Sequence, residues 1–181
     1  MCIRDRNKAG AKFSWEKLNW INSQYIKNME STKLSEIIRK YWDDNGWVPP
    51  SQEWAYKLAI LLRDSMTLLK DSIDQSKPFF LIPTIQKEGQ DFLETKNCKA
   101  SLKLILNYLI EQNTINLNQE KAKEIINEIS KMHNIKKGIL MKSLRVAFFG
   151  SLSGPDLIQS WELFSESKTD RSRIERCLKS I

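Results

Sequence analysis

Asn118-Gln-Glu-Lys-Ala-Lys-Glu-Ile-Ile-Asn-Glu-Ile-Ser-Lys-Met132 shows most plainly how this chain folds. Its apolar residues recur every three or four positions, which is the period of one face of a helix. Glutamate and lysine occupy the positions between them, and Asn118 can cap the first turn with its side chain. The stretch therefore predicts an amphipathic helix with an apolar inner face made of Ala122, Ile125, Ile126, Ile129 and Met132.

The same spacing continues along most of the chain, and no stretch alternates apolar and polar residues as a half-buried strand does. Thr32 is the expected N-cap of a helix that stops at Gly46, and Ser51, after two prolines, can cap the next helix. A last helix is expected after Thr169. We therefore predict an all-α fold of consecutive small helical bundles, with further helices over 32–46, 51–76, 102–110, 143–149 and 156–165.

Polar residues, proline and glycine interrupt the apolar rhythm twice, at 47–51 and at 88–99. These interruptions predict three consecutive pieces, over 11–48, 49–95 and 96–181. Residues 1–10 show no helix or strand pattern, and we expect them to be disordered or non-native. Our hypothesis for residues 1–6 is that they are foreign sequence left by cloning or assembly.

Composition favours a polyanionic partner, because 29 lysines and arginines face 22 acids in 181 residues and the net charge is +7. No apolar run approaches the roughly 20 residues of a membrane-spanning helix, so we expect a soluble, cytoplasmic protein that does not bind membranes. The spacing of Cys2, Cys98 and Cys177 supports neither a disulfide framework nor a metal site. We interpret them as reduced thiols, two of them buried and one in a disordered end.

One segment carries charge of a single sign: the residues between Ile129 and Pro155 include no acid. Such a segment attracts phosphates, although a solvated basic face is the alternative interpretation. The turn Gly150-Ser-Leu-Ser-Gly-Pro-Asp156 could also cradle an anion, but it lacks the lysine of a phosphate loop and is more typical of ordinary turn chemistry. The basic residues of the segment are Lys131, Lys136, Lys137, Lys142 and Arg145.

Two separated segments give the chain a resemblance to a known family. Phe13-Ser-Trp-Glu-Lys-Leu-Asn-Trp-Ile-Asn-Ser-Gln-Tyr-Ile26 resembles the F-x-x-x-K-L-x-W-x-N-x-x-Y-[IL] segment of bacterial-type glutamyl-tRNA synthetases. Leu144-Arg-Val-Ala-Phe-Phe-Gly-Ser-Leu-Ser-Gly-Pro-Asp-Leu157 resembles the family's P-L-R-x-A-x-[TF]-G-x-x-x-G-P-[DE]-L segment, and Leu61-Leu-Arg-Asp-Ser-Met-Thr-Leu-Leu69 is also similar. The resemblance implies the tail of a stem-contact domain at 11–48, followed by two helical anticodon-binding subdomains at 49–95 and 96–181.

The resemblance further implies a parent ligase that uses ATP and Mg²⁺ to attach glutamate to its tRNA. The family's catalytic H-I-G-H-like pair cannot form here, because His133 is the one histidine of the chain and more often such a residue caps a helix or faces solvent. Lys33-Leu34-Ser35-Glu36 has the wrong final charge for a K-L-S-K loop, and Leu34 belongs to an apolar stripe. We therefore expect no catalytic residue and no cofactor in this fragment, which should be inactive alone.

The family's tRNA contacts can be carried over position by position. Arg145 matches a loop-contacting arginine, and Gly154, Pro155 and Leu157 match the turn that packs against anticodon bases; Lys136, Lys137 and Lys142 are candidate phosphate contacts. Relatives specific for glutamate tRNA can have an arginine that reads the third anticodon base where this chain has Ser65. Because a serine hydroxyl is less demanding than an arginine, this difference predicts that glutamine tRNA is also accepted.

The aromatic residues Trp15, Trp20 and Tyr25 could stack on bases, but their spacing more often means packing between neighbouring elements. Four other tryptophans are expected in the core: Trp42, Trp47, Trp54 and Trp161. The alternatives to tRNA recognition within a ligase are a stand-alone helical protein-interaction module and a free-standing regulatory tRNA-binding protein. For tRNA recognition within a ligase and for both alternatives, we expect a monomer.

Overall fold

The computed structural model describes residues 14–113 and 117–180, and within these ranges every regular element is a helix. The predicted all-α class is confirmed. The predictions for residues 1–10, including Cys2, lie outside the described residues. The described elements are α1 (Trp15–Asn28), α2 (Ser31–Asp44), α3 (Gln52–Leu62), the 3-10 helix η1 (Arg63–Ser65), α4 (Asp71–Phe80), α5 (Lys87–Leu93), α6 (Cys98–Glu111), α7 (Gln119–Met132), α8 (Lys137–Phe149), α9 (Leu157–Glu166) and α10 (Asp170–Lys179).

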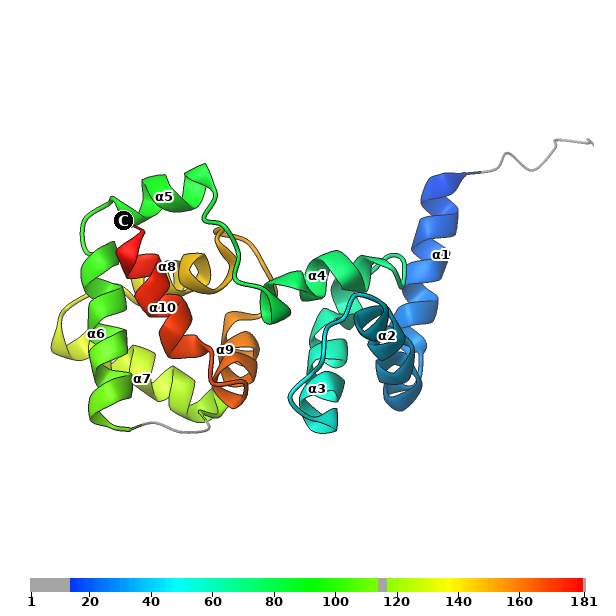
Figure 1. Cartoon of the computed structure of the whole chain (residues 1–181). Helices are drawn as coiled ribbons and strands as arrows, with labels where there is room; N and C mark the ends of the chain where they lie inside the picture. Colours follow the sequence, from blue (N-terminus) through cyan, green and yellow to red (C-terminus); the bar gives the residue numbers. More distant parts are fainter. Residues whose placement is uncertain (1–13, 114–116, 181) are drawn as a thin grey trace, which may run out of the picture.

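The helices form two lobes, the first made of α1 to α4 and the second of α5 to α10 (Figure 1). The chain passes between them once, through residues 81–86, which we call the crossing segment. Helix α3 packs against α9 where the lobes meet. There the Lys57 ammonium lies 3.3 Å from a carboxylate oxygen of Glu162 and 2.5 Å from one of Glu166. The three-piece division of the chain stays a prediction.

Local capping explains several helix ends. The side chains of Ser51 and Asn118 accept hydrogen bonds from the third residue of their helices, at 3.0 and 2.8 Å, so both predicted N-caps are confirmed. Gly46 adopts a φ of +71°, and the amides of Gly46 and Trp47 close the end of α2, which confirms the predicted stop. The predicted Thr32 cap is wrong, because α2 begins at Ser31 and the Thr32 hydroxyl donates to the Glu30 carboxylate. Thr169 holds the N-cap position of α10 without a capping bond.

The single helix predicted over 51–76 is wrong. Helix α3 ends at Leu62, and the chain turns before α4 begins at Asp71. Met66 is extended yet buried, and the Asp71 carboxylate accepts from the amides of Thr67 and Leu68 at 3.0 and 2.7 Å. The side chain thus stabilises the turn. Helix α4 then continues past Ser76 and includes Pro78.

An aromatic cluster joins the cores of the two lobes. Phe79 of the first lobe stacks on Phe164 of the second, with ring centroids 4.9 Å apart and planes 14° from parallel. The Trp54 indole donates to the carbonyl oxygen of Leu163 at 2.8 Å. Trp42, Trp54 and Trp161 are buried and Trp47 stacks on Phe80, as predicted. The cluster gives the lobes a common apolar interior.

Some burial predictions fail. Met132, the last residue of α7, is 71% exposed, so the prediction that it belongs to the apolar inner face is wrong. Trp15, Trp20 and Tyr25 are 69, 64 and 72% exposed, so the prediction that they pack in the core is wrong. Helix α6 contacts α5, α7, α8 and α10, which confirms that 102–110 is enclosed by other helices, although Ile110 is exposed.

Cys98 and Cys177 are free and buried, as expected, and burial raises the pKa of the Cys177 thiol to about 11. Among residues 14–113 and 117–180, no group of three His, Cys, Asp or Glu side chains could hold a metal ion. Within the same ranges, no helix has the length and apolar character needed to cross a bilayer.

Candidate nucleic-acid interface

The turn between α8 and α9 is built on one glycine and one arginine. Gly150 ends α8 in a left-handed conformation, with φ +72°, and its amide donates to the Val146 carbonyl at 2.8 Å. Arg145, one turn earlier, donates through Nη1 to the carbonyl oxygens of Gly154 and Pro155, at 2.8 and 2.9 Å. A single guanidinium therefore holds the far side of the turn against the helix that precedes it.

Gly154 lies directly over the Phe149 ring. A Cβ at this position would approach two ring atoms to 3.2 Å, and φ is +150°, so a side chain would be both crowded and strained. Phe149 is in turn held by the rings of Phe79 and Phe164, each with its centroid 5.8 Å away. The turn thus rests on an aromatic floor, and Arg145 holds two of its carbonyl oxygens.

A cavity of about 400 Å³ lies beside this turn, between the two lobes. It brings Ser65 to the same place as Gly154 and Pro155, although about ninety residues separate them in sequence. The full lining is Ser65, Asp74, Gln75, Pro78, Gln86, Phe149, Ser151, Ser153, Gly154 and Pro155. Three of the candidate residues therefore share one cavity with contributions from both lobes.

Ser65 is coupled to Gln75 of α4. Its hydroxyl lies 2.8 Å from the Leu62 carbonyl oxygen and 2.6 Å from Gln75 Oε1, and Gln75 Nε2 donates to the Ser65 carbonyl at 3.1 Å. The sequence did not identify Gln75 and Asp74 as candidate site residues, because they occupy polar positions within the long helix that it predicted. The cavity offers hydroxyl, amide and carboxylate groups, which can donate to or accept from the edges of nucleotide bases.

The other candidates lie elsewhere. Leu157 is 1% exposed, because its side chain packs in the core at the start of α9; its place in the turn that contacts anticodon bases stays a prediction. Lys136 and Lys137 are exposed at the beginning of α8, about 18 Å from its end at a rise of roughly 1.5 Å per residue. The ammonium of Lys142 lies 5.9 Å from the Phe92 ring centroid. The structure does not gather these lysines around the cavity.

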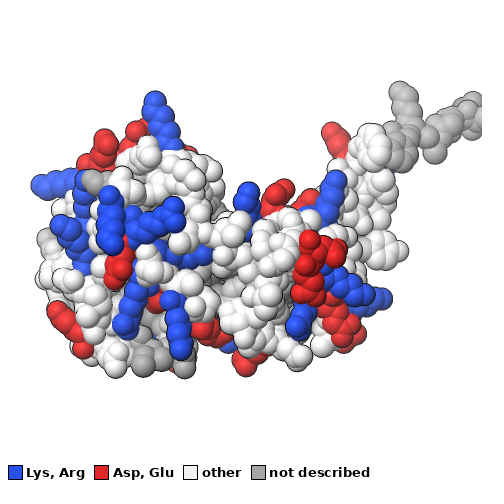
Figure 2. All heavy atoms as spheres, in the orientation of Figure 1, with Lys and Arg blue, Asp and Glu red and all other residues white. Residues whose placement is uncertain are grey.

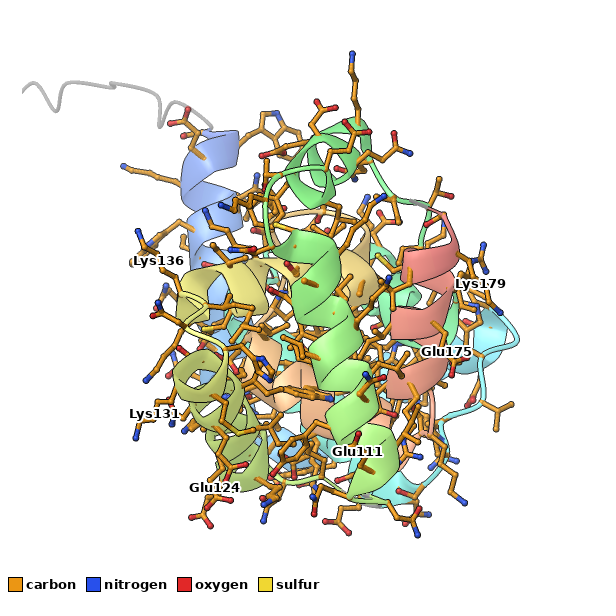
Figure 3. The ribbon with its side chains drawn as sticks, turned by 90° about the vertical axis from the view of Figure 1, so that its left-hand side faces the viewer. Glu111, Glu124, Lys131, Lys136, Glu175 and Lys179 are labelled. Atoms are coloured by element: carbon orange, nitrogen blue, oxygen red, sulfur yellow. The ribbon has the colours of Figure 1, made fainter. Side chains whose placement is uncertain are left out.

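Basic side chains are nevertheless spread over the second lobe. On the face drawn in Figure 2, lysine and arginine are scattered across this lobe, whereas acidic side chains gather on part of the first lobe. Figure 3 places Lys131 and Lys136 together at one edge of the molecule and Lys179 at the opposite edge. The positive charge thus forms a broad field that can draw in a polyanion, rather than a single compact patch.

The structure also explains two features to which the sequence analysis gave no catalytic role. His133 is exposed at the C-cap of α7, as predicted. Lys33-Leu34-Ser35-Glu36 lies within α2 with Leu34 fully buried, so it is a helical turn and not a loop that could clamp phosphates.

Comparison with known proteins assigns the chain to a family. Residues 25–178 match the family described as the anticodon binding domain. Glutamate–tRNA ligases from Prochlorococcus marinus are similar in sequence: the protein of strain MIT 9215 is 88% identical over 179 residues, and that of strain NATL2A is 46% identical over 172 residues. These alignments cover 99% and 95% of this chain.

The chain spans 37% and 36% of the length of those two relatives. A crystal structure of a glutamate tRNA ligase from Elizabethkingia meningosepticum, in complex with its amino acid, superposes with a TM-score of 0.86 at 25% identity, covering 96% of this chain and 34% of that one. A second structure, from Elizabethkingia anophelis, gives a TM-score of 0.80. Since the family match extends over most of the described helices, the chain belongs to the anticodon-binding-domain family.

Proposed function

We propose that the cavity between the lobes binds unpaired nucleotides of a tRNA anticodon loop. The observation that carries this proposal is that Ser65, Gly154 and Pro155 line one cavity. Unpaired bases are recognised by hydrogen bonds to their edges and by stacking on flat surfaces. The cavity is lined by Ser151 and Ser153 of the turn on one side and by Asp74 and Gln75 on the other. Arg145 contributes by holding the turn, and its charge adds to the attraction for nearby phosphates.

The chain would act as part of a glutamate–tRNA ligase. The parent enzyme would join glutamate to tRNA in the cytoplasm, with ATP and Mg²⁺ used in the portion of the ligase that this chain does not span. Anticodon binding would contribute through differential affinity, because correct contacts commit the tRNA to a productive position in a distant active site. The similarity to ligases and the net charge of +7 support this role over a protein-interaction module.

Titration with labelled tRNA at two salt concentrations tests the proposal. Fluorescence anisotropy should detect a complex with glutamate tRNA and with its isolated anticodon stem-loop, and the affinity should fall steeply as salt rises. Arg145→Met should weaken binding about tenfold, because both carbonyl contacts that hold the turn are lost. Lys123→Met, at an exposed position of α7, removes the same charge away from the cavity and is the control. Equal affinity for the two variants would refute the assigned cavity.

A second candidate is that glutamine tRNA is accepted as well. Ser65 and Gln75 already bond to each other, so the proton of the Ser65 hydroxyl is engaged within the protein. Its oxygen can still accept from an N–H of cytosine or of guanine, the third anticodon bases of glutamate and glutamine tRNA, and this contact discriminates little between them. Charging assays of the full-length ligase with both purified tRNAs test this idea. Rejection of glutamine tRNA by more than about a hundredfold would rule it out.

A further inference from the structure

Arg173 of α10 is a buried arginine that touches three separate elements. Its side chain is 2% exposed. Nη1 donates to the Phe148 carbonyl at 3.1 Å, and Nη2 donates to the Leu81 carbonyl at 3.2 Å. The guanidinium carbon lies 4.3 Å from the centroid of the Phe164 ring. These contacts reach the end of α8, the start of the crossing segment and the last turn of α9.

No carboxylate within residues 14–113 and 117–180 forms an ion pair with this guanidinium. Burial lowers the pKa of Arg173 to about 10, so the group remains protonated near neutral pH. A buried charge without an opposite charge is unfavourable, and an apolar side chain of similar volume is often better tolerated in such a place. The specific carbonyl and ring contacts are therefore what an arginine provides here that an apolar residue would not.

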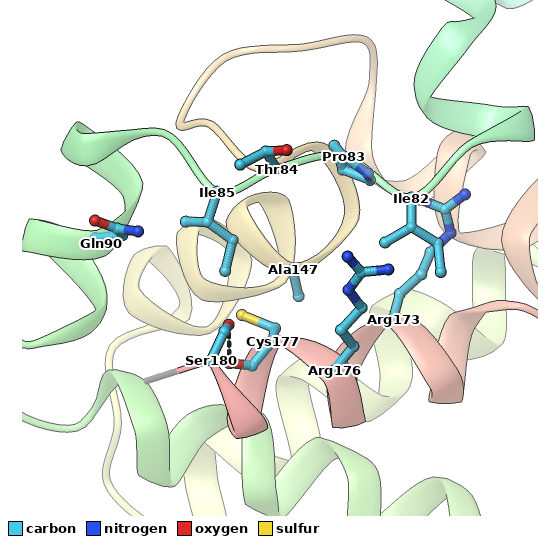
Figure 4. A pocket seen from close by; sticks show the side chains of 10 residues that line it. All are labelled: Ile82, Pro83, Thr84, Ile85, Gln90, Ala147, Arg173, Arg176, Cys177 and Ser180. Carbon is cyan, nitrogen blue, oxygen red and sulfur yellow. Dashed lines mark hydrogen bonds between the residues drawn. The ribbon is translucent and has the colours of Figure 1, made fainter.

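Each of these contacts involves a residue that is next to, or packed against, a residue of the cavity or of its supporting core. Leu81 directly follows α4, which supplies Asp74, Gln75 and Pro78 to the lining, and Phe148 directly precedes Phe149, the floor under Gly154. Phe164 lies between Arg173 and Phe79, because its ring stacks on Phe79 at 4.9 Å. Figure 4 shows Arg173 and Arg176 extending from α10 toward the crossing segment. Arg173 thus binds the carbonyl of Leu81, which follows one side of the cavity, and the carbonyl of Phe148, which precedes the other side.

The other end of the crossing segment is held separately. The Gln86 amide donates to the Gly150 carbonyl at 2.8 Å. The Thr84 carbonyl lies so close to Gly150 that a Cβ on this glycine would be 2.3 Å from the oxygen. With Arg173 at the beginning and Gly150 at the end, the crossing segment is bound to the second lobe at both ends.

We infer that Arg173 is a positioning residue that sets the Ser65 side of the cavity relative to the Gly154 side. It does so by holding the start of the crossing segment against α8 and α9. The consequence for RNA binding rests on the proposed function, whereas the consequence for the lobes does not. Without Arg173, each lobe keeps its helices, but the distance between lobes varies more and the cavity no longer has one shape.

Arg173→Lys and Arg173→Met test the inference. Lysine keeps the charge but cannot reach two carbonyls in fixed directions or stack flat on Phe164. The control is Arg171→Lys on the same helix, because Arg171 donates to the Leu109 carbonyl at 2.7 Å, within the second lobe. Amide exchange at Gln86 reports docking of the crossing segment. Spin labels at positions 40 and 123, on α2 and α7, report the distance between lobes.

In both Arg173 variants, the Gln86 amide should exchange about tenfold faster and the distribution of distances between the two spin labels should broaden. Both variants should also bind the anticodon stem-loop about tenfold more weakly. Arg171→Lys should change none of these three measurements. Unchanged exchange and distances in both Arg173 variants would overturn the inference. Loss of helical circular dichroism in Arg173→Lys would also overturn it, because the residue would then be needed for folding rather than for position. If the unaltered protein bound no RNA, the proposed function would fail, but exchange and distance would still decide the role of Arg173.

Discussion

Replacing Gly150 by alanine should destabilise the protein far more than the same change at Gly46. Both glycines have nearly the same left-handed backbone, with φ +72° and +71°. An alanine in this conformation costs about 1 to 2 kcal/mol at either site. A Cβ at Gly46 meets no atom within 4 Å, whereas a Cβ at Gly150 would be 2.3 Å from the Thr84 carbonyl oxygen. The pair therefore separates backbone strain from a steric clash.

The clash can be relieved only by moving the crossing segment away from α8. That movement breaks the 2.8 Å hydrogen bond from the Gln86 amide to the Gly150 carbonyl. Loss of such a bond costs about 1 to 3 kcal/mol, so Gly150→Ala should lose about 2 to 5 kcal/mol in total. At about 2 to 4 °C per kcal/mol, its melting temperature should fall clearly below that of Gly46→Ala.

Urea unfolding followed by circular dichroism measures both variants, provided that the slope m stays constant. Gly150→Ala should also weaken binding of the anticodon stem-loop, because the turn over Phe149 shifts with the segment. The reasoning is refuted if the two variants unfold at the same urea concentration, since Thr84 would then not lie against Gly150.

Three further substitutions or treatments have definite expected outcomes. Met132→Ala should change the free energy of unfolding by less than about 0.5 kcal/mol, while Ile129→Ala, on the buried face of the same helix, should lose about 2 to 5 kcal/mol in the same urea titration. Trp54→Phe removes the bond to the Leu163 carbonyl and should lose about 1 to 2 kcal/mol by calorimetry; no loss would mean that this bond does not help join the lobes. Cys177, whose pKa burial raises to about 11, should resist iodoacetamide at about pH 8 when folded and react in guanidinium chloride, as peptide mass spectrometry would show.

The pKa of Cys177 also sets the sign of one pH effect. The thiol keeps its proton in the folded state up to about pH 11, while the unfolded chain loses it from about pH 9. The unfolded state therefore binds fewer protons in this window, so stability should decrease as the pH rises through it. Cys177→Ala should reduce that slope.

Much of the helical fold could be predicted because the interactions that define a helix are local. The stripe in α7 and the side-chain caps at Ser51 and Asn118 involve residues within one or two turns of each other. The break after Leu62 could not be predicted in this way. Apolar residues continue at helical spacing through Met66, whereas the structure breaks the helix, packs an extended Met66 in the core and holds the turn with the Asp71 carboxylate.

The sequence identified several residues that line the cavity, but it did not show that they lie together. Arg145, Gly154 and Pro155 belong to a motif that is visible in the sequence, and Ser65 was predicted from the resemblance to the family. Gln75 and Asp74, which also line the cavity, belong to no motif, because their place there depends on how α4 packs relative to the second lobe. Leu157 belongs to the motif but is buried beneath the turn.

The sequence by itself determined the all-α class, the caps at Ser51 and Asn118 and the excess of positive charge, because hydrophobic period, capping and charge are properties of neighbouring residues. Tertiary structure alone decided that Ser65 lines the same cavity as Gly154 and that Arg173 donates a hydrogen bond to the crossing segment. It also decided which apolar residues remain exposed, as on α1. These outcomes depend on contacts between residues far apart in the chain, which form only when the two lobes pack on their common aromatic core.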